Sequence, residues 1–133
     1  MTLYLDASAL VKRYLVEPGS DAIRRATDLA ERRFMSRVGF VETFGTLARR
    51  SHAARIEQFR SEWPLIHVIE LREALAERAA ELAGSSRLGA LDAVHLASAL
   101  MLPADDVVFA TWDRRLHAAA QAHGLAMLPE ALA

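Results

Sequence analysis

Short apolar runs alternate with helical patterns along this chain of 133 residues. Each run is followed by a stretch whose apolar residues recur at helical spacing. This alternation favours a parallel sheet covered on both faces, because parallel strands are joined by helical crossovers. We therefore predict an α/β fold, a three-layer α/β/α sandwich with a short, mainly parallel four- to five-stranded sheet, in a single domain spanning residues 1–133. The expected strands are Leu3–Leu5, Phe34–Ser36, Leu65–Leu71, Val107–Thr111 and Leu125–Leu128.

Capping and turn residues delimit the expected helices. Ser20 or Asp21 is expected to cap the second helix, Gly84 to stop the fifth, and Pro103 to close the sixth. Asp113 is expected to open the last helix. The expected ranges are Ala9–Leu15, Ser20–Arg33, Val38–Arg50, Ala53–Glu62, Arg72–Ala83, Ala90–Leu102 and Asp113–Gly124.

Composition narrows the class of protein. The absence of cysteine excludes disulfides and zinc–thiolate sites. No signal peptide precedes the first expected strand, and the most apolar region, residues 88–110, is interrupted by Asp92, His95 and Pro103. We therefore expect a cytoplasmic protein without a membrane segment.

The net charge of −1 argues against binding nucleic acid by bulk charge alone. Arginine, which pairs bidentately with phosphate, nevertheless greatly outnumbers lysine, a bias that a GC-rich genome explains equally well.

Two aspartates follow apolar strands at their carboxyl ends. Asp6 comes directly after Leu3–Leu5, and Asp113 follows Val107–Thr111. In a parallel sheet both positions lie at the same edge, which is where α/β sheets bind ligands. Asp6 fits equally well as a helix N-cap, whose carboxylate accepts a free backbone N–H.

Asp92 and Glu42 stand out among the acidic residues expected in helices. Asp92 belongs to a helix that is apolar nearly all round, and a buried carboxylate must be paired, protonated or bound to metal. Its position in the first turn also suits a cap. Glu42 shares a helical face with Gly45 and Arg49, so a functional role and an intrahelical salt bridge to Arg49 both fit.

Four segments, taken in order, give the chain a likeness to a known family. They are LYLDASALVKRY (3–14), MSRVGFVETFGTLARR (35–50), RLGALDAVHLASAL (87–100) and VVFATWDRRLHAAA (107–120). Together they resemble the PIN-domain ribonucleases and, within them, the toxin half of VapBC-type toxin–antitoxin pairs. The resemblance spans nearly the whole chain. Trp112 departs from the family pattern, where smaller residues are commoner beside the last acid, and it bears on the shape of a substrate groove.

The resemblance implies a PIN-like fold and a metal-dependent endoribonuclease that hydrolyses RNA as the toxin of a type II toxin–antitoxin system. It implies an acidic quartet, catalytic and metal-binding, formed by Asp6, Glu42, Asp92 and Asp113. Hard carboxylate oxygens and the absence of cysteine suit Mg²⁺ or Mn²⁺ as the cofactor. The implied partners are RNA, a small antitoxin protein and a second copy of the chain in a homodimer.

Other polar residues lie near these acids in the sequence. Ser8 and Thr111 match polar positions of the family. Arg114 and Arg115 follow Asp113 and either steer the RNA backbone or form a solvated helix face. We expect His95 to be a hydrogen-bonded core histidine, at best one that orients Asp92. The remaining histidines are expected at the surface or at element ends: His52, His67, His117 and His123.

Aromatic and apolar residues are plentiful between Phe34 and Trp63, and they include Phe40, Phe44 and Phe59. Some of them exceed what a short helical pair can bury. We therefore expect part of this segment to form an interaction surface.

Several other classes of protein begin with a strand that ends in aspartate. A haloacid-dehalogenase-like phosphatase needs a second aspartate where this chain has Ser8. A response-receiver domain needs a phosphoacceptor aspartate after the third strand, and Leu65–Leu71 is not followed by one. Two alternatives stay open, a PIN-fold nuclease outside a toxin–antitoxin pair and a catalytically silent PIN-fold binding module. Four mutually repelling acids count against the silent module.

Overall fold

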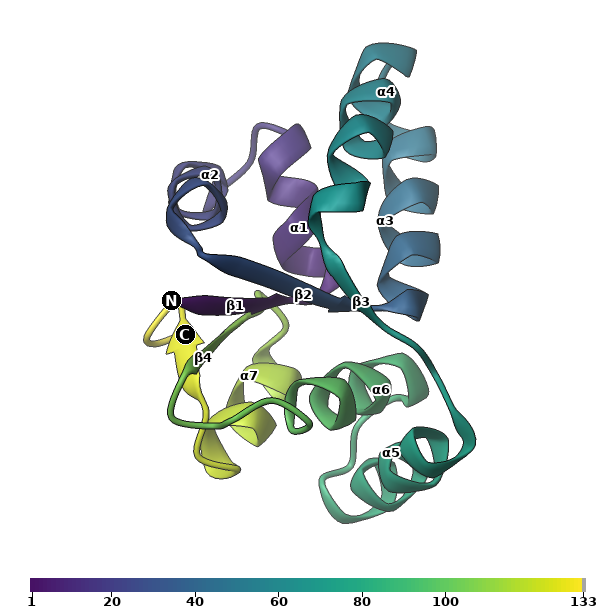
Figure 1. Cartoon of the computed structure of the whole chain (residues 1–133), viewed down its shortest axis with the longest axis vertical. Coiled ribbons are helices and arrows are strands. Elements are labelled where there is room, and N and C mark those ends of the chain that lie inside the picture. Colours follow the sequence, from purple (N-terminus) through teal and green to yellow (C-terminus); the bar gives the residue numbers. More distant parts are fainter. Residues whose placement is uncertain (133) are drawn as a thin grey trace.

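The computed structural model, which describes residues 1–132, contains the predicted α/β sandwich (Figure 1). Within these residues five parallel strands form one sheet in the order β3-β2-β1-β4-β5. The strands are β1 (Thr2–Leu5), β2 (Arg32–Ser36), β3 (His67–Ile69), β4 (Val107–Ala110) and β5 (Ala126–Leu128). The helices are α1 (Ala7–Tyr14), α2 (Ser20–Leu29), α3 (Arg37–Arg50), α4 (Ala53–Glu62), α5 (Glu73–Ser85), α6 (Ala90–Ala99) and α7 (Arg114–Ala122), with a 3₁₀ turn η1 (Trp63–Leu65).

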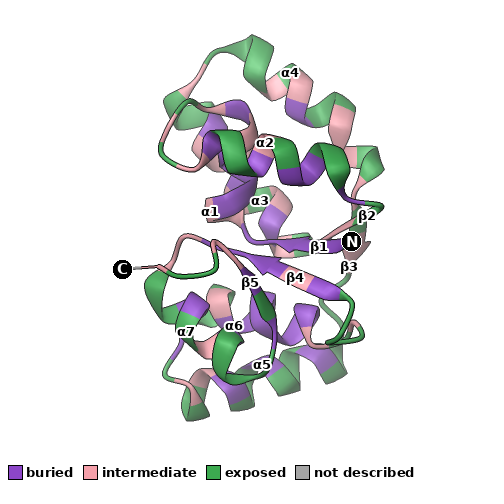
Figure 2. Cartoon of the chain, turned by 90° about the vertical axis from the view of Figure 1, so that its left-hand side faces the viewer, coloured by how far each residue is buried: buried purple, intermediate pink, exposed green. Residues whose placement is uncertain are grey.

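The sheet separates two helical layers, each with its own apolar core. Helices α1 to α4 cover one face, and α5, α6 and α7 cover the other (Figures 1 and 2). Because successive strand residues point to opposite faces, Leu3 and Leu5 pack under the first layer and Tyr4 packs under the second. All three are fully buried. None of the helices between residues 1 and 132 has the length and apolar character that a membrane crossing requires.

The boundaries of α2 differ from those expected. The helix ends at Leu29 rather than near Arg33, because the residues that follow pair with β1 as strand β2. Its N-cap position is Gly19, with φ of +93°, so neither Ser20 nor Asp21 caps it. Tertiary pairing therefore decides where this helix ends, in place of local helix propensity.

The ends of α5 and α6 also differ from the prediction. Gly84 does not stop α5, which continues to Ser85. A single glycine costs about 1 kcal/mol in a helix, which the buried face of α5 offsets. The α6 helix ends at Ala99, three residues before Leu102, and the chain then turns toward β4.

The aromatic side chains between β2 and η1 pack mainly against one another. Phe40 lies 5.5 Å from Phe59 and 5.0 Å from Trp63, and Phe44 lies 5.9 Å from Phe40, measured between ring centroids. Phe59 is completely buried. These aromatic side chains form the core between α3, α4 and the sheet, and the interaction surface expected in this segment stays a prediction. The large apolar side chains exposed in this segment are Val41 and Leu65.

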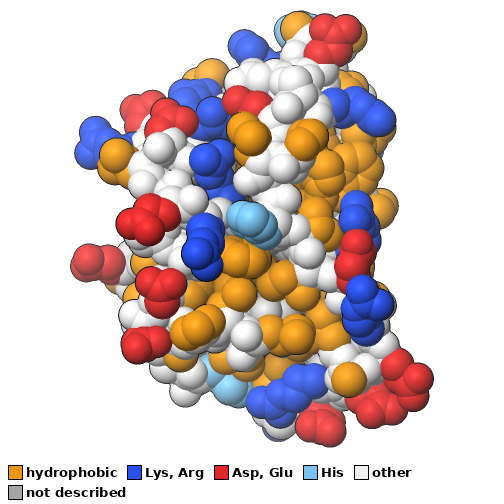
Figure 3. Space-filling model, in the orientation of Figure 1, with side chains coloured by type: hydrophobic (Ala, Val, Ile, Leu, Met, Phe, Trp, Pro, Cys, Tyr) orange, Lys and Arg blue, Asp and Glu red, His pale blue; other side chains and the backbone are white. Residues whose placement is uncertain are grey.

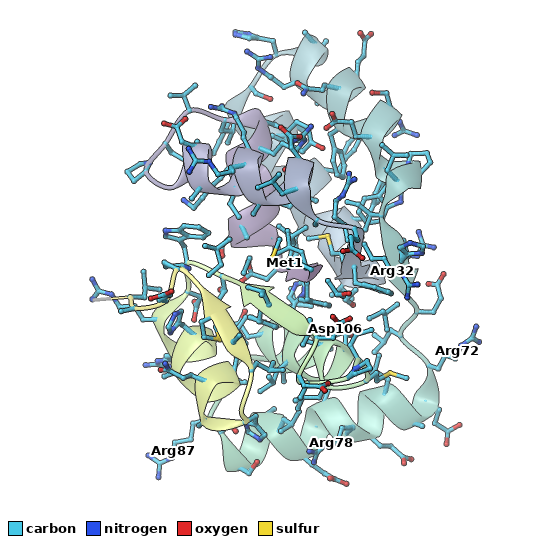
Figure 4. All side chains as sticks on the ribbon, turned by 60° about the vertical axis from the view of Figure 1, so that its left-hand side comes forward. Met1, Arg32, Arg72, Arg78, Arg87 and Asp106 are labelled. Carbon is cyan, nitrogen blue, oxygen red and sulfur yellow. The ribbon has the colours of Figure 1, made fainter. Side chains whose placement is uncertain are left out.

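The two edges of the sheet differ in chemistry. At the amino edge, Met1, Arg32 and Asp106 lie where β1, β2 and β4 begin (Figure 4). The Thr2 hydroxyl donates to Asp106 there, at 2.8 Å, and ties β1 to the turn before β4. The carboxyl edge is the side on which the candidate acids follow their strands, so the fold places them together and away from this pair.

Candidate active site

Each acid of the quartet reaches the carboxyl edge of the sheet from a different element. Asp6 follows β1 and Asp113 follows β4, whereas Glu42 lies in the second turn of α3 and Asp92 in the first turn of α6. β1 pairs in parallel with both β2 and β4, so the carboxyl ends of these three strands are neighbours. The first and last of the four positions are 107 residues apart in sequence, and the parallel topology brings all four to one edge.

Asp6 is the most buried of the four, with 3% of its surface exposed. Its Oδ1 accepts hydrogen bonds from the backbone N–H of Ala9 at 2.9 Å and from the Ser8 hydroxyl at 2.7 Å. Its Oδ2 accepts one from Thr111 at 2.6 Å. Burial raises the pKa of the carboxyl group, and these hydrogen bonds oppose the shift. Asp6 is therefore the N-cap of α1, and its carboxylate is also held in one orientation at the edge of the sheet.

Ser8 and Thr111 link Asp6 to the segment that carries Asp113. The Ser8 hydroxyl accepts from the backbone N–H of Trp112 at 2.9 Å, and the Thr111 hydroxyl accepts from that of Asp113 at 3.0 Å. Asp113 Oδ1 accepts from the N–H of Leu116 and so caps α7. Both hydroxyls thus donate to Asp6 and accept from backbone N–H groups of the segment that follows β4, which links the Asp6 carboxylate to the segment of Asp113.

Glu42 is held by a buried hydrogen-bond chain that crosses the sheet layer. Its Oε1 lies 2.7 Å from Nε2 of His95, and Nδ1 of His95 lies 2.8 Å from the hydroxyl of Tyr4. The Tyr4 oxygen accepts from the backbone N–H of Ser36 at 3.1 Å. Since that oxygen is already an acceptor, its proton goes to Nδ1, which assigns the proton of His95 to Nε2, facing Glu42.

These hydrogen bonds correct the expected partner of His95 and decide between the two roles expected for Glu42. The direct hydrogen-bond partner of His95 is Glu42 and not Asp92. His95 is nevertheless a core histidine as predicted, with 1% of its surface exposed. The structure pairs Glu42 with His95 across the fold, in place of an intrahelical bridge to Arg49, whose guanidinium lies 3.4 Å from the hydroxyl of Thr46.

Asp92 does not cap α6. The N-cap residue is Gly89, and no side chain makes a capping hydrogen bond there. Burial, with further contributions from the negative charges of Asp113 and Asp6, raises the pKa of Asp92 to about 6. Two like charges disfavour ionisation only when they lie close together. Asp92 therefore experiences the field of the other acids, as a member of the same cluster.

The donor chemistry suits a hard divalent cation. Four carboxylates lie at one edge, and burial together with the charges of Asp113 and Asp6 raises the pKa of Asp92, so a cation there would favour the ionised form. Among residues 1–132, no three His, Asp or Glu side chains are close enough to hold a metal ion as they stand. Asp92 is partly exposed and makes no capping hydrogen bond, so its side chain is freer to rotate than those of Asp6 and Glu42, which hydrogen bonds hold.

Two arginines predicted at the site and four histidines expected away from it remain to be placed. Arg114 and Arg115 are exposed in the first turn of α7, beside Asp113, where they extend into solvent. His117 was expected at the surface or at an element end; it lies in the first turns of α7 and is buried, and its Nε2 contacts the carbonyl of Pro129 at 2.7 Å. His52, His67 and His123 are exposed, as predicted.

Sequence reasoning missed Tyr4, whose hydroxyl orients the histidine that contacts Glu42. A signal was available, because a tyrosine within a fully buried strand needs a hydrogen-bond partner for its hydroxyl. Burial also raises the pKa of Tyr4, so the phenol keeps its proton. The hydrogen-bond chain that links Ser36, Tyr4, His95 and Glu42 therefore always has the Tyr4 hydroxyl as a donor.

We expect Tyr4→Phe to lower the free energy of unfolding by about 1–3 kcal/mol, because it leaves a buried N–H of Ser36 and a buried nitrogen of His95 without their partner. Urea denaturation of both proteins measures the difference. Phenylalanine keeps the ring stacked on Phe109, at 5.2 Å between centroids, so packing loss is small. A change below about 0.5 kcal/mol, the range of ordinary surface substitutions, would mean that the hydrogen-bond chain contributes little.

Comparison with known proteins places this arrangement in a family. The PIN domain family model matches residues 3–122. Ribonuclease VapC45 from Mycobacterium tuberculosis (strain CDC 1551 / Oshkosh) is 34% identical, over 98% of this chain and 96% of its own length. Ribonuclease VapC46 from M. tuberculosis (strain ATCC 25618 / H37Rv) is 36% identical, over 95% of each.

Solved structures share the fold at lower identity. The crystal structure of M. tuberculosis VapC20, titled a Sarcin-Ricin loop cleaving toxin, has a TM-score of 0.71 and 17% identity, and the match covers 88% of this chain and 94% of that one. A toxin–antitoxin complex from Klebsiella pneumoniae matches with a TM-score of 0.67 and 15% identity, over 84% and 86%. With its acids at the carboxyl edge of a parallel sheet and its nearly full-length match to VapC ribonucleases, the chain belongs to the PIN domain family.

Proposed function

We propose that the protein is a metal-dependent endoribonuclease that hydrolyses RNA phosphodiester bonds as the toxin of a type II toxin–antitoxin pair. The observation that carries the proposal is that four acids reach one edge of the sheet, Asp6 after β1, Asp113 after β4, Glu42 from α3 and Asp92 from α6. A cation would neutralise the repulsion among carboxylates gathered in this way. The VapC ribonucleases that match nearly the whole chain support the same reaction class.

We assign Asp6, Asp92 and Asp113 as residues that would hold Mg²⁺ or Mn²⁺, directly or through water, with Glu42 as a fourth ligand or as the group that orients the attacking water. When bound, such an ion lowers the pKa of a water molecule and neutralises charge on the phosphate. Ser8 and Thr111 keep the Asp6 carboxylate in one orientation. His95 fixes Glu42 through its Nε2–H.

Two further groups contact the RNA in this proposal. Arg114 and Arg115 are exposed beside Asp113, so their guanidinium groups are free to approach the phosphate backbone from solvent. They would favour association through charge, which weakens as salt increases.

The proposed partners are RNA, a small antitoxin protein and a second copy of the chain, in a single-domain cytoplasmic protein. Support for an antitoxin comes from structural neighbours that are themselves toxin–antitoxin complexes, such as the one from Klebsiella pneumoniae. A nuclease outside such a pair would cleave RNA without an antitoxin encoded beside it. A silent binding module would neither cleave RNA nor gain stability from Mg²⁺.

RNA cleavage by the purified chain, free of any antitoxin, tests the reaction. We expect cleavage of structured RNA with Mg²⁺ or Mn²⁺, loss of cleavage with EDTA, and recovery when the ion is restored. Asp6→Asn is expected to lower the cleavage rate by roughly a thousandfold, because a metal's charge stabilisation is worth several kcal/mol. Asparagine keeps an oxygen that can accept from Ala9, so the cap of α1 survives.

Asp105→Asn is the matched control for this substitution. Asp105 is exposed in the turn before β4, at the opposite edge of the sheet, and its removal changes net charge by the same amount. Cleavage that persists in EDTA and in Asp6→Asn would exclude the metal mechanism.

A further inference from the structure

A groove opens beside the acids, on the side of the α1–α4 layer. Its volume is about 350 Å³, and Ser8 and Glu42 of the candidate site form part of its lining. The other residues that matter for its chemistry are Trp112, Lys12, Glu17 and Arg50. The groove is therefore continuous with the acid cluster and large enough for one small ligand unit.

Trp112 forms a rigid wall of this groove. A Cβ atom added at Gly19 would lie 2.6 Å from Cζ2 of the indole, so the backbone of this glycine packs directly on the ring. The ammonium group of Lys12 lies over the ring, 4.9 Å from its centroid. Gly19 has φ of +93°, which any other residue would adopt with strain. The indole is thus packed against Gly19 and Lys12, and it is partly exposed where it lines the groove.

Two cations and one anion of the lining, Lys12, Arg50 and Glu17, lie together and leave an excess of positive charge among these three. Glu17 is shared between two cations, with Lys12 Nζ at 3.0 Å and Arg50 Nη2 at 3.0 Å. Lys12 is almost fully buried and also donates to the carbonyl of Pro18. The side chain of Arg50 is 53% exposed, and a guanidinium has five N–H donors, so its bond to Glu17 leaves others for an anion.

We propose that this groove binds one unstacked nucleotide of the RNA, next to the scissile phosphate, with its base against Trp112 and its phosphate on Arg50. This inference rests on the proposed function and adds a binding site to it. The indole of Trp112 suits stacking with a base, and the exposed guanidinium of Arg50 suits a phosphate. Both line one groove that reaches Glu42 of the acid cluster, where the next phosphate of the RNA would lie. A base within a helix is stacked and paired, so the site selects single-stranded or loop RNA.

Fluorescence measures binding in the groove without reference to cleavage. Trp63 is the only other tryptophan of the chain, so Trp63→Phe leaves Trp112 as the single indole emitter. We expect a single-stranded RNA oligonucleotide to quench this emission saturably and a blunt duplex of the same sequence to quench it much less. The absence of quenching up to about 0.1 mM RNA, the weak end of non-specific binding, overturns the inference.

Kinetics provides the second test. Trp112→Ala should raise KM for single-stranded RNA about tenfold, the loss expected for one stacked base, whereas Trp112→Phe should retain most of the affinity. Arg50→Gln should lower the slope of log KM against log salt by about one, as expected for one phosphate contact. Arg78→Gln, an exposed residue of α5 on the other side of the sheet (Figure 4), should leave both quantities unchanged.

The outcomes separate this inference from the function on which it rests. Quenching by single-stranded RNA without any cleavage would reject the endoribonuclease and retain the nucleotide groove. Cleavage with wild-type KM and salt slope in both Trp112→Ala and Arg50→Gln would retain the nuclease and reject the groove. Quenching by an acidic peptide but not by RNA would assign the groove to a protein partner and also reject the inference.

Discussion

Asp92→Asn is expected to abolish RNA cleavage and at the same time to raise the melting temperature of the metal-free protein. The physical reason is that burial and the charges of Asp113 and Asp6 raise the pKa of Asp92 to about 6, so its ionised form is unfavourable in the folded state. Asparagine keeps the shape and removes the charge. After allowance for the partial exposure of Asp92, we expect a gain of about 1 kcal/mol, or about 4 °C, at neutral pH.

The pH dependence of this gain has a defined sign. The pKa of Asp92 is raised above its ordinary value of 3.8, so between about pH 4 and pH 6 the folded protein binds more protons than the unfolded chain. Wild-type stability therefore falls relative to Asp92→Asn as the pH rises through this window, and the difference stays constant above it. Thermal scans of both proteins in EDTA, from pH 4 to pH 8, measure the window.

Adding Mg²⁺ should reverse the order of stability. A ligand that binds only the folded state stabilises it by RT ln(1 + [L]/Kd), about 2.7 kcal/mol at a hundredfold excess over Kd. We expect wild type to gain this stabilisation and Asp92→Asn to gain much less. A variant that melts several degrees lower in EDTA and still responds fully to Mg²⁺ would show that Asp92 has a structural role instead.

Glu62→Gln is expected to lower the free energy of unfolding by about 2 kcal/mol. The carboxylate of Glu62 accepts two hydrogen bonds from Arg13, at 2.9 and 3.0 Å, and one from the hydroxyl of Tyr14 at 2.7 Å. This cluster ties α1 to the end of α4. Breaking a fully buried pair costs about 3–5 kcal/mol, and the value here is smaller because a quarter of the Glu62 side chain is exposed.

The ionised form of Glu62 stabilises the folded protein, whereas the ionised form of Asp92 destabilises it, so the two have opposite pH dependences. Hydrogen bonding from Arg13 lowers the pKa of Glu62 below its ordinary value of 4.5 despite partial burial. The folded state therefore gains stability above the unfolded pKa and loses it as the pH falls through the folded pKa. Urea denaturation at pH 7 and pH 3 should show a smaller difference between wild type and Glu62→Gln at the lower pH.

The chain contains a matched control for this pair. Arg37 and Glu70 form a similar two-point contact, at 2.8 and 2.7 Å, but both side chains are more than 40% exposed. We expect Glu70→Gln to leave the melting temperature unchanged, because solvent screens an exposed pair. Equal losses in Glu62→Gln and Glu70→Gln would mean that exposure does not decide the contribution of such pairs.

The order of elements and the candidate acids were readable in the sequence. An apolar run followed by Asp6, and another followed by Asp113, predict two carboxylates at one sheet edge because strand polarity is uniform in a parallel sheet. The apolar surroundings of Asp92 indicated a carboxylate in need of a partner or cation, and its raised pKa agrees with that inference. Their assignment as metal ligands remains a prediction.

Pairings across the fold were not readable, because they depend on which side chains the sheet brings together. Local spacing offered Asp92 as the partner of His95, three residues away, but the packing of α6 against the sheet placed His95 between Tyr4 and Glu42. Strand pairing with β1 ended α2 at Leu29.

The sequence by itself determined the elements, their order and the edge at which the acids lie, because hydrophobic periodicity and strand polarity are local properties. Only the tertiary structure decided which groups orient those acids and where a groove opens beside them. In the sequence, Trp112 is only a departure from the family pattern. In the fold, its indole packs against Gly19 and Lys12 and lines the groove. Such contacts join residues about 100 positions apart, and their geometry follows from packing that no local pattern encodes.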